Sequence, residues 1–101
     1  MTAYVIGEVE IRQPEQMVGY AEKVAQAVAQ YGGRYLARGT KPEVLEGGPA
    51  HKILMIEFPN VEAAHAWYGS PEYAEAHAIR RGHSDLRLII VDGVNALKPQ
   101  P

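Results

Sequence analysis

The sequence contains no cysteine, only one tryptophan and one phenylalanine, and no long run of lysine or arginine. Without cysteine the chain forms no disulfide, no thiolate metal site and no cysteine nucleophile. Its formal net charge of −2 supplies no electrostatic footprint for nucleic acid or for an anionic membrane. No apolar stretch approaches the roughly 20 residues that cross a bilayer. We therefore expect no nucleic-acid partner and no membrane contact.

The composition is that of an ordinary globular chain, with 47% hydrophobic and 22% charged residues among 101. We predict one domain over residues 1–95 and a flexible C-terminal tail over residues 96–101, where two prolines fall. Because Met1 leads almost directly into an alternating pattern, we expect no leader peptide and a cytoplasmic protein.

Hydrophobic periodicity predicts the secondary structure. Strands are predicted over residues 3–11, 34–38, 51–58 and 86–91, with a short extended piece at 43–46. Pro14 fits the first turn of a helix that Gly32 and Gly33 end. Asn60 and Ser70 are predicted N-caps of two further helices, of which Gly69 ends the first and the second runs to about Gly82.

The order strand, helix, strand, strand, helix, strand is that of a ferredoxin-like α+β sandwich, a four-stranded antiparallel sheet with helices on one face. The opposite face is too apolar for water and too charged for a dry core. We therefore predict that a second copy covers it, in a homodimer closed by its sheets as a dimeric α/β barrel. On that face we expect Glu8 to neighbour both Glu57 and Arg87 in a buried charged triad.

Several short segments resemble one family. They are Tyr31–Gly39, Leu45-Glu46-Gly47, Ile56-Glu57-Phe58-Pro59, Ala63-Ala64 with Ala66-Trp67-Tyr68, Ser70-Pro71-Glu72-Tyr73, and Arg80. In this order they resemble the domain-of-unknown-function 1330 family of small bacterial proteins, over residues 4–93. The resemblance implies the dimeric α/β-barrel superfamily, whose members include cofactor-free monooxygenases, haem-degrading enzymes and muconolactone isomerases. Gln13 replaces an acidic residue common in the family, and His65 and His77 occupy variable positions, which makes these histidines weaker catalytic candidates.

An aromatic cluster is the first candidate site. Trp67, Tyr68 and Tyr73 are suited to line a flat pocket for an aromatic or quinone-like ligand. The alternative is that Trp67 packs its helix onto the sheet, and the sequence favours this for the tryptophan. Ser70 is more simply a helix cap than a nucleophile.

Charged residues within or beside apolar strands are the second candidate site. A partly buried Glu57 or Glu46 is suited to act as a general base, and Arg38 to hold an anionic substrate or an enolate oxygen. The alternative, which the sequence slightly favours, is a structural ion-pair set of these residues with Arg80, formed within one chain or across the dimer. The histidines lack the short helical spacing of a metal site, so no metal is expected.

The leading hypothesis is a small-molecule pocket between sheet and helices, with Glu57 and Arg38 as catalytic residues. Its proposed ligand-binding residues are Glu46, Trp67, Tyr68, Ser70, Tyr73 and Arg80. If the protein is an enzyme, the superfamily resemblance implies cofactor-independent oxygenation or isomerisation of a small aromatic or enolisable substrate. The rival hypothesis is a non-catalytic ligand carrier or stress-related dimer, in which the same residues are structural.

Overall fold

The computed structural model describes residues 2–93 and contains one antiparallel sheet in the order β2-β3-β1-β4. Its strands are β1 (Ala3–Ile11), β2 (Arg34–Thr40), β3 (Lys52–Phe58) and β4 (Ser84–Asp92). The first strand lies between the third and the fourth, as the predicted fold requires. The predicted C-terminal tail lies outside the described residues.

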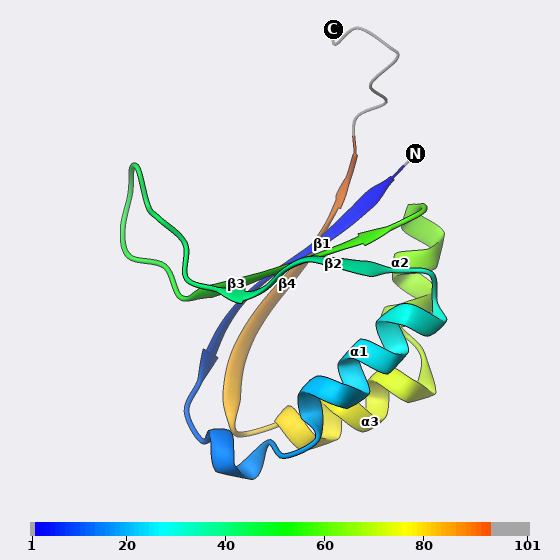
Figure 1. Cartoon of the computed structure of the whole chain (residues 1–101), viewed down its shortest axis with the longest axis horizontal. Coiled ribbons are helices and arrows are strands. Elements are labelled where there is room, and N and C mark those ends of the chain that lie inside the picture. Colours follow the sequence, from blue (N-terminus) through cyan, green and yellow to red (C-terminus); the bar gives the residue numbers. More distant parts are fainter. Residues whose placement is uncertain (1, 94–101) are drawn as a thin grey trace, which may run out of the picture.

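The helices are the short 3-10 helix η1 (Pro14–Gln16), α1 (Tyr20–Gln30), α2 (Val61–Tyr68) and α3 (Pro71–Arg80). The helices α1, α2 and α3 lie on the same side of the sheet, and the short helix η1 lies past the end of β1, as Figure 1 shows. This arrangement confirms the predicted ferredoxin-like α+β sandwich. Within residues 2–93, no helix has the length and apolar character that crossing a membrane requires.

Two predicted elements differ from the structure. The helix expected from Pro14 begins only at Tyr20, because Gly19 adopts a left-handed conformation with φ of 84° and separates η1 from α1. The extended piece expected at residues 43–46 is not a strand. The chain leaves the edge strand β2 at Thr40 and returns at Lys52, and between them it runs away from the helices as a long loop (Figure 1).

The two predicted caps of the later helices are confirmed. The side-chain oxygen of Asn60 accepts a hydrogen bond of 2.7 Å from the backbone N–H of Ala63, which starts α2. The hydroxyl of Ser70 accepts one of 3.0 Å from the N–H of Tyr73, which starts α3. Only Gly69 separates α2 from the cap of α3, so the two helices are held at a fixed, tight junction.

The core lies between the helices and the sheet. Its largest fully buried side chains are Val5, Val28, Ile56, Phe58 and Trp67. Gly33 lets the end of α1 approach this core closely, since a Cβ there would lie 2.7 Å from the Phe58 ring. The Gly32-Gly33 pair therefore ends the helix and also makes room for a core aromatic ring.

Candidate functional site

A cavity of about 330 Å³ lies between α2 and the edge strand β4. It is lined by Val5, His65, Trp67, Tyr68, Leu88, Ile89 and Ile90. The wall combines aromatic rings from one helix with aliphatic side chains from two strands, and His65 adds an imidazole. Such a size and lining suit a small, largely apolar ligand with one polar group.

Trp67 is held firmly on the inner wall of this cavity. Its side chain is 1% exposed, and its ring packs on Phe58 at 5.5 Å and on Tyr73 at 4.7 Å between ring centroids. The predicted packing role of the tryptophan is thus confirmed, and the same ring also lines the cavity. A ligand there would meet a rigid aromatic surface, which costs little conformational entropy on binding.

Tyr68 and Ser70 flank Trp67 at the helix junction, and their surroundings differ. Tyr68 is 55% exposed and packs its ring on Tyr73 at 5.3 Å between centroids. Ser70 is buried, and besides capping α3 its hydroxyl donates a 2.7 Å hydrogen bond to the Trp67 carbonyl. Because both hydrogen-bonding capacities of the Ser70 hydroxyl are used for structure, its predicted role as a cap is the one the geometry supports.

Three buried polar atoms of α2 and α3 have no hydrogen-bond partner among residues 2–93: the indole N–H of Trp67, the hydroxyl of Tyr73 and Nε of Arg80. Most buried polar atoms in proteins are paired, so an unpaired set is a candidate for ligand recognition. The sequence pointed to all three residues as ligand-binding candidates. It did not indicate that their unpaired atoms would be donors.

Two further tyrosines, Tyr20 of α1 and Tyr35 of β2, pack against the same core between the helices and the sheet. Burial raises the pKa of Tyr20 to about 12 and also raises the pKa of Tyr35 and Tyr73. Arg80 opposes the effect for Tyr20 and Tyr73, because its positive charge lowers their pKa. Arg80 is close enough to hydrogen-bond the phenol oxygens, which also lowers their pKa. By length and angle, however, the Tyr73 hydroxyl and Nε of Arg80 have no hydrogen-bond partner among residues 2–93.

Sequence reasoning missed Tyr20 and Tyr35. Both lie on the core-facing side of their elements, where a tyrosine reads as a packing residue. The position of each in its element was visible, but that Tyr20 lies near Arg80 and that both tyrosines lie near Tyr73 depends on how the helices pack together and onto the sheet. No pattern within either segment carries that information.

Glu57 and Arg38, the predicted catalytic pair, lie on opposite faces of the sheet. Glu57 stands between the fully buried Ile56 and Phe58, so it points away from the helices, and its carboxylate accepts a 2.8 Å hydrogen bond from Arg34. Arg38 instead turns toward α1, where it donates a 3.0 Å hydrogen bond to the Ala21 carbonyl. The structure does not bring the pair together, and their catalytic role stays a prediction.

Arg38 makes one further contact, with its guanidinium 4.8 Å above the Tyr35 ring centroid. Glu46 lies exposed in the loop between β2 and β3. The ion pairs that the described residues form do not join Arg38, Glu46, Glu57 and Arg80 into one set. The expected structural set of these four residues is therefore not formed within the described residues of one chain, and its formation across a dimer stays a prediction.

The predicted triad of Glu8, Glu57 and Arg87 is also corrected by the strand register. Glu8 is opposite Arg87 on one side and Ile53 on the other, whereas Glu57 is opposite Tyr4. Because Ile53 and Glu57 are four residues apart on β3, the two glutamates are separated along the sheet. The prediction named the right face and the right Glu8–Arg87 pairing but assumed the wrong register for β3.

The face away from the helices, called here the open face, carries ordered rows of side chains. Tyr4 and Val91, then Ile6, Met55 and Ile89, form apolar rows. Glu57 and Arg34 continue the Tyr4–Val91 row toward the β2 edge, and Glu8 with Arg87 lie in the next row beyond Ile6, beside Ile53. Ile89 and Val91 are 40% and 41% exposed, so an apolar band crosses the open face without cover from other parts of residues 2–93.

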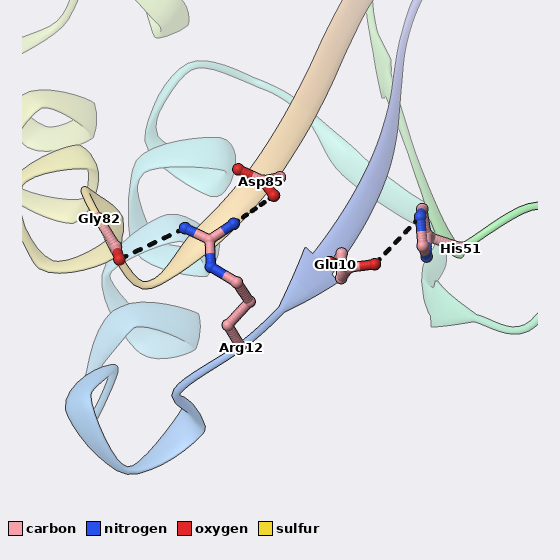
Figure 2. Close-up of polar contacts among 5 residues, drawn as sticks. All are labelled: Glu10, Arg12, His51, Gly82 and Asp85. Atoms are coloured by element: carbon pink, nitrogen blue, oxygen red, sulfur yellow. Dashed lines mark hydrogen bonds and ion pairs between the residues drawn. The ribbon is translucent and has the colours of Figure 1, made fainter.

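A polar cluster occupies the far end of the open face (Figure 2). His51 contacts the Glu10 carboxylate at 3.2 Å, while Arg12 pairs with Asp85 and reaches the Gly82 carbonyl. These contacts tie the start of β3 to β1, and the end of β1 to the start of β4. Among residues 2–93, no three histidine, aspartate or glutamate side chains are grouped as a metal site would need. We interpret the cluster as structural.

Comparison with known proteins gives a family and a fold. The sequence model of a family described as Domain of unknown function (DUF1330) matches residues 2–94. No curated protein matches the chain. A protein of unknown function from Rhodopseudomonas palustris is similar in structure, with a TM-score of 0.74 and 20% identity, over 93% of this chain and 83% of that one.

Two other solved structures are similar at lower identity. A dimeric ferredoxin-like protein of unknown function from a Jannaschia species has a TM-score of 0.68 and 8% identity, over 92% of this chain and 100% of that one. SnoaB, a cofactor-independent oxygenase from Streptomyces nogalater, has a TM-score of 0.65 and 11% identity, over 97% of this chain and 98% of that one. At these identities the likeness shows the fold.

Proposed function

This chain belongs to the family described as Domain of unknown function (DUF1330), and we propose that it is a homodimer that binds a small aromatic or enolisable compound. The cavity between α2 and β4 is the observation that carries the proposal. Its volume of about 330 Å³ accepts one or two fused rings, which would stack on Trp67 and Tyr68.

The homodimer follows from the open face. The apolar side chains give a second sheet a surface to cover, and the charged side chains beside them would fix how the two copies align. Ile89 belongs to this face and also lines the cavity, so a second copy packed there would lie close to the bound ligand. The dimeric ferredoxin-like protein from Jannaschia supports this arrangement by analogy of fold.

The proposed chemistry is cofactor-independent oxygenation or isomerisation. His65 is the basic side chain on the cavity wall and would remove a proton from a ligand carbon activated by a neighbouring carbonyl. In isomerisation the proton returns at another carbon. In oxygenation dioxygen is the second substrate: a methylene becomes a carbonyl, and the other oxygen atom leaves as water with the two hydrogens.

The rival function is that of a ligand carrier, with the same pocket and no turnover. One observation favours it: the cavity wall includes no carboxylate, and Glu57 and Glu46 lie elsewhere. A His65→Gln variant separates the two functions, with His77→Gln on the exposed side of α3 as its control. For an enzyme, His65→Gln keeps ligand affinity and abolishes product formation, seen by oxygen uptake or by chromatography of the ligand. For a carrier, the wild-type protein returns the ligand unchanged.

A further inference from the structure

The three unpaired polar atoms of Trp67, Tyr73 and Arg80 can all donate a hydrogen bond. Trp67 Nε1 and Arg80 Nε carry hydrogen and accept nothing, and the Tyr73 hydroxyl is free to turn its hydrogen toward an acceptor. Trp67 and Tyr73 are only 1% and 3% exposed, so these two groups are out of reach of bulk solvent. Leaving such groups unpaired costs stability, and a ligand that accepts their hydrogen bonds recovers that cost.

These donors adjoin the proposed pocket. Trp67 and Tyr68 line the cavity, and the Tyr73 ring packs against both of them, at 4.7 Å and 5.3 Å between centroids. Tyr20 and Arg80 lie close to Tyr73, since Arg80 lowers the pKa of both tyrosines and Tyr73 raises the pKa of Tyr20. Tyr73 and Arg80 therefore stand behind the aromatic wall, where α1 packs against α3.

The positive charge of Arg80 is not neutralised by a carboxylate of the described residues. Of the ion pairs formed among residues 2–93, none includes Arg80. The two glutamates of α3 are engaged elsewhere, Glu72 accepting a 2.8 Å hydrogen bond from Tyr31 and Glu75 lying 3.4 Å from Lys23. A guanidinium, phenols and an indole N–H without a carboxylate form a site that selects for negative charge.

We propose that the ligand is an aromatic oxyanion, whose ring occupies the cavity and whose negatively charged oxygen is held by the Tyr73 hydroxyl and Arg80. This inference rests on the proposed function and adds the charge of the ligand to it. Tyr68 is the side chain that must move, because it lines the cavity, packs on Tyr73 and is 55% exposed. The same donors would stabilise an enolate formed when a proton leaves the bound ligand.

The test compares a charged probe with its neutral analogue. Isothermal titration calorimetry at neutral pH measures the binding of 2-naphthoate and 2-naphthamide, which share one ring system. We expect the wild-type protein to bind 2-naphthoate at least about 10-fold more tightly, because a charge-assisted hydrogen bond is worth more than a neutral one. Arg80→Gln and Tyr73→Phe should each reduce this ratio at least about 3-fold, because losing a donor weakens 2-naphthoate more than the neutral 2-naphthamide. Arg81→Gln, at the neighbouring exposed position, should keep the wild-type ratio.

The outcomes separate this inference from the proposed function. Equal affinity of the wild-type protein for both probes overturns the selection for an oxyanion and leaves the aromatic pocket standing. Binding of neither probe overturns both. If Arg80→Gln and Tyr73→Phe weaken both probes equally, the two side chains only support the fold, and the inference is wrong. Circular dichroism of each variant confirms that it is folded before titration, and Tyr73→Phe, which keeps the ring, serves if Arg80→Gln does not fold.

Discussion

The rings of Trp67 and Tyr73 lie 4.7 Å apart between centroids with their planes at 53°, and the polar atom of each is buried without a hydrogen-bond partner. The contact joins the last turn of α2 to the first turn of α3 across the Ser70 cap. A pair that only packed the core would be served as well by phenylalanine. Unpaired donors at a tight helix junction beside a cavity are what a ligand-binding site needs.

The open face gives the first prediction. Ile89→Asp places a charge in the middle apolar row, and we expect it to weaken self-association at least about 10-fold, because the carboxylate would be buried without a partner. Val18→Asp, at a position 82% exposed outside the sheet, is the control and should not change association. Sedimentation velocity measures both. A wild-type mass near the 11.1 kDa of one chain at micromolar concentration would contradict the homodimer.

The stability of the protein at alkaline pH tests the burial of the Tyr20 hydroxyl. Burial raises the pKa of Tyr20 to about 12, so the folded chain keeps the phenol proton after an unfolded tyrosine, with a pKa near 10, has lost it. The free energy of unfolding is therefore unaffected by this group below about pH 10 and falls between about pH 10 and 12. The loss from Tyr20 is on the order of 2 kcal/mol. Urea unfolding of Tyr20→Phe should show a smaller fall than the wild-type protein over this range, and an identical fall would contradict the assignment.

Ser70 is expected to act through structure. Ser70→Ala removes the acceptor for the Tyr73 N–H and the donor to the Trp67 carbonyl, and should lower the free energy of unfolding by about 1–2 kcal/mol. Asn60→Ala removes the corresponding cap of α2 at an exposed position and should cost less. Thermal and urea unfolding compare the two variants. If Ser70→Ala kept full stability but lost turnover of a substrate, Ser70 would be a nucleophile.

Gly33 offers a test of the core. Gly33→Ala would place a methyl group 2.7 Å from the Phe58 ring and 2.9 Å from a Val28 methyl group. We expect a loss of about 1–3 kcal/mol, because a close-packed core accommodates an added methyl group only by shifting its neighbours. Gly48→Ala is the control, because a Cβ there meets nothing within 4 Å. Equal stability of the two variants would show that the end of α1 moves freely away from the sheet.

The sequence was sufficient for the features that depend on near neighbours along the chain. Alternation placed the four strands, and the Asn60 and Ser70 caps predicted two helix starts to the residue. The first helix was misplaced because proline at a first turn and glycine within an amphipathic stripe give opposing signals. At Gly19 the left-handed conformation prevailed.

The candidate site depended more on features that the sequence does not contain. The register of β3 against β1 decides that Glu57 faces Tyr4 and not Glu8, and the shift within β2 turns Arg38 toward α1. Aromatic residues beside a helix junction were a correct guide to the cavity, since Trp67 and Tyr68 line it. The convergence of Tyr20 with Arg80 arises from helix packing, which no local pattern specifies.

A crystal structure of the protein with 2-naphthoate tests the central claim most directly. We predict density for the ring system in the cavity between α2 and β4, against Trp67 and Tyr68, with the carboxylate directed toward Tyr73 and Arg80. An empty cavity at saturating ligand, or the ligand bound at another place on the chain, would contradict the account.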